Sequence, residues 1–445
     1  MFKKSIILSF CLWLSCMNAE AAFFRPETFT LKNGMQVVLV TDTSTPVIFH
    51  AVWYKVGRGD EAPEEPSGIA HFCEHMMFKG TSNITRDELN STLFKIGAIK
   101  NAMTSFDYTT YYELIESSSI ETVMRLEADR MVNLLIKEED VASERGVVME
   151  ERKTNIESSP EGRIMEASIS AFFTNHPYRI LPIGLMDDIA SYSSKDVKSF
   201  YKKWYHPNNA ILVVVGDISL ERLKELTQKY YGVLPAGPTL VRNRLKEPQR
   251  TDVLKDVNLG ANEVGLPSVK LYYDAPSVRS DPKKAYALQV GLEAVFGSSV
   301  DYFKRAMITE RKALSGMSTS YDGFSYDPMW LSISLQPLPG IKWKQLSVIL
   351  EEVLNKALKS ISPEDVKLAK ARILGRLEYD RADIFEVGMI IGNVLASGYT
   401  LEDLESYPDK VNDVKHEEVL DVMMDVLKMP KVRSFLAPLS KKGAK

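Results

Sequence analysis

The pentapeptide His71-Phe72-Cys73-Glu74-His75 contains three side chains that can bind a metal ion or move a proton. On a helix, positions i, i+3 and i+4 lie within one arc of roughly 100°, so His71, Glu74 and His75 would face the same point. Two imidazoles on adjacent turns can bind one zinc ion, and the carboxylate between them can reach a water on that ion. Zinc lowers the pKa of such a water towards about 7, so Glu74 would accept its proton and later pass it to the leaving amine. The spacing favours a zinc hydrolase over the alternative, two surface histidines on one helix.

A catalytic zinc site of this kind needs a third protein ligand and an open fourth position. The acidic segment 144–151 supplies candidates. Glu144 and Glu151 are seven residues apart and share a helix face, whereas Glu150 points elsewhere. Spacing alone allows Glu144, Glu151 or Glu157 as the ligand, and a solvated acidic helix face is the alternative to any of them.

The elements that must position these residues can be read from local patterns. The segment 29–40 is typical of a hairpin, because Asn33-Gly34 favours a two-residue turn. A helix is expected from Gly68 onward, with Ser67 as its N-cap. Apolar spacing and β-branched runs predict further strands at 47–56 and 211–215 and helices at 119–136, 143–157 and 220–231.

The chain is long enough for two domains. At 445 residues it exceeds what one hydrophobic core usually supports. Prolines and charges without an apolar period mark residues 233–256 as a linker between a domain at 22–232 and a second at 257–445. The second half repeats the order of elements, with strands at 269–273 and 331–335 and helices at 284–296, 343–358 and 363–379. We therefore expect a duplicated α+β domain.

The composition is that of an ordinary globular protein. Hydrophobic residues make up 45% and charged residues 26%, which argues against both a disordered chain and a protein with many membrane spans. The formal net charge of -4 offers no electrostatic basis for nucleic-acid binding.

The first residues differ from the rest and predict export. Lys3-Lys4, an apolar run at 6–17 and the small-residue exit 19–21 form a secretory signal pattern with cleavage after Ala21, the alternative being an uncleaved anchor. Cleavage would leave no stable membrane span. Of three cysteines, only Cys73 would then remain, so no intramolecular disulfide can form. A bacterial periplasm is the predicted location, with extracellular release as the alternative.

Several segments resemble the pitrilysin and insulysin family of zinc peptidases, and most closely their subunit-sized members such as the β subunit of mitochondrial processing peptidase. Residues 68–81 resemble the family's active-site stretch, and 101–105 through Tyr111-Tyr112 resemble its substrate-side strand. The segment from Glu144-Arg145 to Glu151 resembles the one carrying the distal ligand. Residues 205–209, leading to 216–217, resemble the end of its first domain. The resemblance covers about residues 24–220 well and the second half loosely.

This resemblance implies a zinc endopeptidase with one zinc ion per chain, Glu151 as the third ligand and Glu144 as an acid behind the ligands, which would orient them. It also implies a half-chamber of two domains, each a mixed sheet backed by helices. Peptides would bind there as an added strand along the backbone of Asn101 and Ala102. Cys73 is interpreted as a buried packing residue.

The second half departs from the family pattern in one respect. Relatives carry an Arg followed seven residues later by a Tyr, a pair that helps to hold the substrate backbone, and the matching positions here are Thr309 and Gly316. Neither side chain can replace the lost donors. We therefore expect a heterodimer in which a related subunit supplies the pair. The alternative is an alignment shift, with Arg311 serving instead and a homodimer sufficing.

Two other functions remain open from the residues alone. The chain could be a catalytically silent assembly subunit, but silent relatives lose the residues that are intact at positions 71, 74, 75 and 151. It could also be a zinc-binding protein without catalysis, for which a base such as Glu74 between the ligands would be unnecessary.

Overall fold

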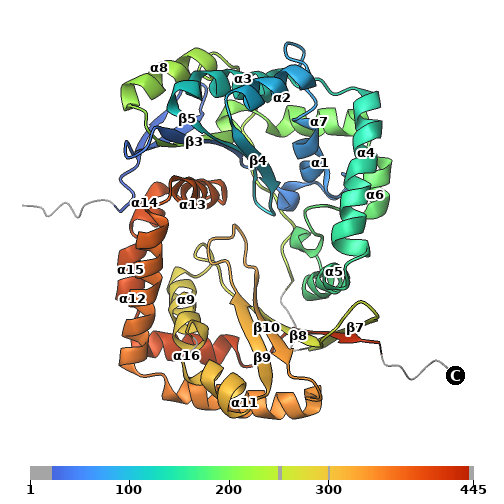
Figure 1. Cartoon of the computed structure of the whole chain (residues 1–445), viewed down its shortest axis with the longest axis vertical. Helices are drawn as coiled ribbons and strands as arrows, with labels where there is room; N and C mark the ends of the chain where they lie inside the picture. The colour runs from blue at the N-terminus through green and yellow to red at the C-terminus, as the bar shows by residue number, and fades with distance from the viewer. Residues whose placement is uncertain (1–22, 249–252, 299–300, 440–445) are drawn as a thin grey trace, which may run out of the picture.

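Two mixed β-sheets, each backed by helices, make up the computed structural model, which describes residues 23–248, 253–298 and 301–439 (Figure 1). The signal predicted at 1–21 lies outside the described residues. The upper domain in Figure 1 belongs to the N-terminal half and the lower one to the C-terminal half.

The first sheet has six strands in the order β1-β2-β6-β3-β5-β4. β2 and β6 are parallel, with Val38 opposite Val213, and the other neighbouring pairs are antiparallel. The strands are β1 Glu27–Thr30, β2 Gln36–Thr41, β3 Val47–Tyr54, β4 Ile99–Thr104, β5 Thr109–Glu116 and β6 Ala210–Gly216. The helices of this half are α1 Ile69–Met76, α2 Arg86–Lys95, α3 Ile120–Asn133, α4 Glu138–Arg152, α5 Pro160–Phe172, α6 Met186–Ser191, α7 Ser194–Trp204 and α8 Leu220–Tyr230, with short turns η1 Arg58–Asp60, η2 Ser117–Ser119, η4 Pro177–Arg179 and η5 Pro207–Asn209 and a π-helix η3 Lys153–Glu157.

The second sheet repeats this topology in the order β7-β11-β8-β10-β9, again with one parallel pair, β7 and β11, within the described chain. Its strands are β7 Lys255–Ala261, β8 Ser268–Asp274, β9 Leu314–Ser320, β10 Trp330–Pro337 and β11 Val432–Pro438. The helices are α9 Pro282–Phe296, α10 Tyr302–Lys304, the π-helix η6 Arg305–Glu310, α11 Trp343–Ser360, α12 Pro363–Asp380, α13 Ile384–Ala396, α14 Leu401–Glu405, α15 Tyr407–Asp413 and α16 His416–Val426. When the parallel pair β7–β11 is matched with the parallel pair β2–β6, the edge strand β9 corresponds to the edge strand β4. The expected α+β duplication is therefore confirmed, while the exact domain limits remain predictions.

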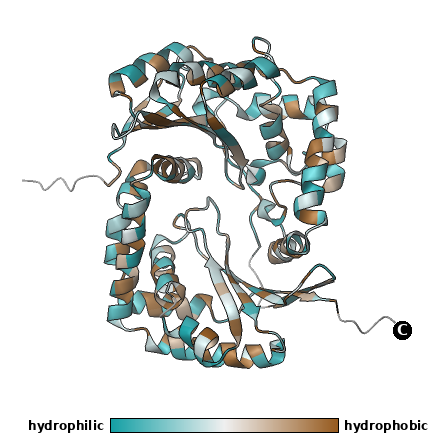
Figure 2. Ribbon diagram, viewed as in Figure 1, coloured by the Kyte–Doolittle hydropathy of each residue, from teal (hydrophilic) through white to brown (hydrophobic). Residues whose placement is uncertain are grey.

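The two domains exchange one helix each. Side chains on one face of the first sheet, among them Phe49, Trp53 and Val213, pack into the same core as α13 of the second half. The opposite face, with Val52 and Val214, packs against the helices of the first half. Figure 2 shows the hydrophobic residues of α13 lying beneath this hydrophobic sheet. Conversely, α5 of the first half packs on β7 and β11 of the second sheet. Each sheet is therefore covered in part by a helix from the other half of the chain.

Three local expectations need correction. The hairpin at 29–40 forms, but the bond from Leu31 N–H to the Met35 carbonyl leaves a three-residue loop in which only Gly34, at φ 90°, has a positive φ. The helix expected at 143–157 begins earlier, at Glu138, because three acidic residues in its first turn favour a helix N-terminus there. It continues as the π-helix from Lys153 to Glu157.

Candidate metal centre

Helix α1 carries the pentapeptide, and its start is set by a carboxylate from an earlier segment. The Oε2 and Oε1 atoms of Glu61 accept hydrogen bonds from the backbone N–H groups of Gly68 (2.8 Å) and Ala70 (3.0 Å). Arg58 lies 3.1 Å from the same carboxylate. The predicted N-cap role of Ser67 is wrong, because Gly68 is the N-cap and the Ser67 hydroxyl donates instead to Asp188 at 2.5 Å.

Gly68 can hold this position only as glycine. Its φ of 86° is in the left-handed region, and a Cβ there would lie 2.6 Å from the backbone of Gly184. The entry into α1 is therefore fixed by close backbone contact as well as by Glu61, so the direction in which His71 and His75 project is well defined.

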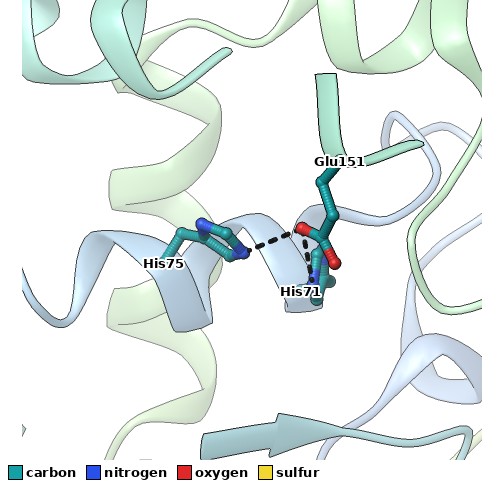
Figure 3. A group of neighbouring side chains, drawn as sticks. All are labelled: His71, His75 and Glu151. Atoms are coloured by element: carbon teal, nitrogen blue, oxygen red, sulfur yellow. Dashed lines mark ion pairs between the residues drawn. The ribbon is translucent and has the colours of Figure 1, made fainter. Parts of the chain in front are cut away.

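Three side chains that can bind a metal converge between α1 and α4 (Figure 3). Glu151 Oε2 lies 3.7 Å from His71 Nε2 and 3.3 Å from His75 Nε2. Among the described residues, this is the one group of three histidine, cysteine or acidic side chains whose ligand atoms all lie within 4.8 Å of one another. Glu150 points elsewhere, toward Lys153 at 3.2 Å, and Glu157 contacts Arg152 at 3.1 Å.

The donor set fits a zinc ion. Tetrahedral ligands about 2.0–2.1 Å from zinc lie about 3.3–3.4 Å from one another, close to the two distances from Glu151. Glu151 Oε2 is buried yet makes no hydrogen bond within the described part of the chain, an arrangement that a bound cation would satisfy. Burial and the neighbouring charge of His75 lower the pKa of His71 to about 4, so His71 is neutral at neutral pH, as a ligand must be.

A second carboxylate lies behind the histidines. His75 Nδ1 lies 2.9 Å from Glu144 Oε1, and the ammonium group of Lys79 contacts the other oxygen of Glu144. Burial raises the pKa of Glu144, but the contacts with His75 and Lys79 outweigh it and leave that pKa below its ordinary value. Burial lowers the pKa of His75, but its contacts with Glu144 and Glu151 outweigh burial and raise it to about 9. Metal binding to His75 must therefore displace a proton.

Glu74 lies beside this group and contacts the edge strand. Its side chain is buried, and the hydroxyl of Thr104 on β4 donates to its Oε2 at 2.5 Å. Burial raises the pKa of Glu74 to about 7, against the opposing effect of the Thr104 hydrogen bond. A carboxyl group with a pKa near neutrality is suited to accept and return a proton at neutral pH.

The predicted peptide-binding residues lie on an open edge. Asn101 and Ala102 are on β4, which pairs only with β5 within the described structure. The Ala102 N–H donates to the side-chain Oδ1 of its neighbour Asn101 at 2.9 Å, so this backbone N–H group of β4 already has a hydrogen-bond partner.

Cys73 is fully buried, in agreement with the interpretation that it is a packing residue.

Three residues around the site received no role from the sequence, namely Glu61, Lys79 and Thr104. Lys79 and Thr104 lie inside the segments that resemble the family, so the resemblance could have pointed to both residues. The sequence around Glu61 offers no such signal, since this residue caps α1 from outside the motif.

In the second half, Thr309 is exposed on η6 and Gly316 lies on β9, while Arg311 contacts Glu352 of α11.

Comparison with known proteins shows the family to which this chain belongs. Residues 36–181 match the family model for insulinase, peptidase family M16, and residues 191–373 match the model for the peptidase M16 inactive domain. The zinc protease PqqE of Helicobacter pylori is 30% identical over 425 residues, covering 93% of this chain and 92% of that protein. The crystal structure of a protease from Helicobacter pylori, 28% identical, has a TM-score of 0.85 and covers 93% of this chain and 99% of that one.

The periplasmic protease PqqL from Escherichia coli shares the fold, with a TM-score of 0.77 at 20% identity, over 93% of this chain and 48% of that longer chain. The two sheets backed by helices define the two-domain fold that this chain shares with these proteases. The chain belongs to peptidase family M16, the insulinase family. No helix within the described part of the chain has both the length and the apolar character that a membrane span requires.

Proposed function

We propose that this protein is a zinc-dependent endopeptidase that cleaves extended peptides. The observation that carries the proposal is the convergence of His71, His75 and Glu151, with Glu74 buried on the same helix as the two histidines. The names of relatives, among them the zinc protease PqqE, support zinc and peptide hydrolysis as the chemistry.

Each residue has a distinct role in this proposal. His71, His75 and Glu151 hold one zinc ion per chain, which supplies Lewis acidity for hydrolysis when bound. Glu74 accepts a proton from the attacking water and passes it to the departing amine, and Thr104 holds the carboxylate of Glu74 in place. Glu144 fixes the orientation of His75. The substrate backbone pairs with β4 at Asn101 and Ala102, which places the scissile bond beside Glu74.

Metal analysis and peptide cleavage test this assignment together. The protein purified from its native source through a tag on this chain, together with whatever co-purifies, should contain about one zinc per copy of this chain. Chelation should abolish cleavage of an extended fluorogenic peptide, and added zinc should restore it. Cleavage that persists in zinc-free protein, or protein that binds no zinc, would contradict the proposal.

We further propose that the active form is a heterodimer with a related subunit. The exposed Thr309 has no cationic group and Gly316 has no hydroxyl. Arg311, the alternative donor, contacts Glu352 on α11, and this ion pair competes with any role toward a substrate. Loss of such donors typically costs about 3–4 kcal/mol of transition-state stabilisation. A partner that presents an Arg and a Tyr across the chamber would restore them.

Activity assays of this chain alone and with its co-purified partner separate the possibilities. The heterodimer proposal predicts that the chain alone is slower by about 100-fold or more. Full activity from a homogeneous preparation of this single chain would contradict it and would favour a homodimer.

The exported, periplasmic location predicted from residues 1–21 is supported by the periplasmic PqqL protease of the same fold. Cell fractionation tests this location.

A further inference from the structure

The connecting segment between the domains contains a buried arginine that contacts both of them. The described residues between α8 and β7 form no regular helix or strand. Nevertheless, the side chain of Arg244 in this segment is only 4% exposed. A guanidinium can be buried when several acceptors satisfy its donors, and its planar fork suits paired carboxylate contacts. The surroundings of Arg244 therefore show what this segment holds together.

On the side of the first domain, Arg244 binds two carboxylates. Its Nε and Nη2 donate to the two oxygens of Asp60 at 3.0 Å and 2.9 Å, and its Nη1 donates to Asp107 Oδ1 at 2.6 Å. Asp60 is fully buried and Asp107 nearly so. Gly59 leaves room for this contact, because a Cβ there would lie 2.8 Å from the guanidinium carbon.

On the side of the second domain, the Nη1 atom of Arg244 also contacts the loop between β9 and β10. Arg244 Nη1 also lies 3.1 Å from Asp327 Oδ2, and the guanidinium lies over the ring of Tyr326. The Tyr326 N–H donates to Asp107 Oδ2 at 3.0 Å. The tips of the corresponding hairpins β4–β5 and β9–β10 thus meet at Arg244, and Figure 1 shows the β9–β10 hairpin extending toward the upper domain.

Both segments that Arg244 holds in the first domain lead directly to the candidate site. Asp60 precedes Glu61, whose carboxylate caps α1. Asp107 lies in the turn that follows Thr104, the residue that donates to Glu74. These two segments are also bonded to each other, because the N–H groups of Arg58 and Gly59 donate to the carbonyls of Ser105 and Phe106.

We propose that Arg244 is a positioning residue that couples the placement of the second domain to the alignment of Glu74 and helix α1. The proposal rests on the proposed peptidase function for its kinetic consequence only. When the β9–β10 loop is docked, Asp327 and Tyr326 hold Arg244 and Asp107, and the hairpin turn keeps Thr104 against Glu74. When that loop moves away, Arg244 keeps its contacts with Asp60 and Asp107, but Asp107 loses the Tyr326 N–H and Arg244 loses Asp327, so the hairpin turn is held by fewer contacts.

The Asp327→Asn variant tests this coupling, since it removes the charge of a partly exposed carboxylate that pairs with both Arg244 and His176 while keeping the shape of the side chain. With the tag-purified complex, kcat should fall by about 10-fold or more with KM nearly unchanged, because misalignment of a reacting group costs rate rather than binding. Zinc content should stay at the wild-type level. Asp256→Asn is the matched control, since it breaks the exposed ion pair with Arg433 and touches neither hairpin. The control should match wild type.

Hydrogen exchange of the amides of Arg58, Gly59 and Ser105 gives a readout that does not depend on peptidase activity. In Asp327→Asn these amides should exchange faster than in wild type, while amides of the first sheet keep their protection. Arg244→Lys should show the same local change, because a single ammonium cannot replace the fork between Asp60 and Asp107. Unchanged exchange at these amides in Asp327→Asn, or an equal increase across the whole domain, would overturn the coupling. If wild type proves not to be a peptidase, this exchange pattern still decides the coupling.

Discussion

The hydroxyl of Thr104 donates to the carboxylate of Glu74 at 2.5 Å, which links the open edge strand of the first sheet to the proposed catalytic base. The neighbouring Thr109 hydroxyl is committed to the Val56 carbonyl at 3.0 Å. Thr104 is therefore the one side chain that an observed hydrogen bond joins to Glu74 in the described structure. A peptide that pairs with β4 would lie along the strand that also orients the base.

Replacing Thr104 by Val should lower kcat by about 10- to 100-fold, because a hydrogen bond to a charged group is lost in a buried site. The Thr104 bond lowers the pKa of Glu74, so its removal should raise that pKa. Activity needs Glu74 ionised, and the acid limb of the pH–rate profile should therefore move to higher pH. Thr104→Ser keeps the hydroxyl and should restore most of the rate. Equal rates and pH profiles for the Val and Ser variants would exclude this role.

Replacing Glu144 by Gln should weaken zinc binding by about 10- to 100-fold, the usual effect of losing a partner behind a metal ligand. The change removes the negative charge that faces His75 and leaves the Lys79 ammonium uncompensated. Competition with a chromogenic chelator measures the affinity. Glu139→Gln, on the exposed start of the same helix, is the control and should bind zinc as wild type does. An unchanged affinity for Glu144→Gln would remove its proposed role.

Replacing Glu151 by Gln should weaken zinc binding more than replacing Glu150 does. Glu151 Oε2 lies within 3.7 Å of both imidazoles, whereas Glu150 is exposed and contacts Lys153. Zinc titration of the two variants provides the comparison. If both variants bound zinc equally well, the distal ligand would have to be sought elsewhere.

Replacing Gly388 by Ala should destabilise the protein by about 1–3 kcal/mol, because inserting a methyl group into a packed core strains it. A Cβ at Gly388 would lie 2.2 Å from the ring of Phe49, where α13 packs on the first sheet. Gly375→Ala on α12 is the matched control, since its Cβ would meet no atom within 4 Å. The control should gain about 0.5–1 kcal/mol, the usual effect of this change in an exposed helix. Thermal unfolding of both variants measures the difference, and a stabilised Gly388→Ala would refute the packing argument.

The parts of the site that lie within one helix follow from the sequence by geometry. Positions 71, 74 and 75 share a face on any helix, and positions 144 and 151 share a face on another, so convergence needed only that the two helices meet. Local capping was less predictable. A Ser before an apolar helix is a common N-cap, but here Glu61, seven residues before Gly68, performs that function.

Contacts between distant segments are what the sequence could not reveal. Repeated element order predicts two similar domains, but nothing in the pattern of residues 384–396 shows that this helix packs on the other domain's sheet. Likewise, residues 233–248 and 253–254 form no regular helix or strand, yet Arg244 is buried between the domains, which no local pattern in this segment indicates. Its partners Asp60, Asp107 and Asp327 come from three separate turns.

Whether Glu74 is the general base is decided by the zinc content and the peptide-cleavage rate of the Glu74→Gln variant, both measured on the complex purified through a tag on this chain. Gln has nearly the same shape but cannot accept the proton from water. We expect about one zinc per chain, as in wild type, with cleavage slower by about 10²- to 10⁴-fold. Cleavage at the wild-type rate would show that Glu74 is not the base, and loss of zinc together with activity would make it a ligand instead.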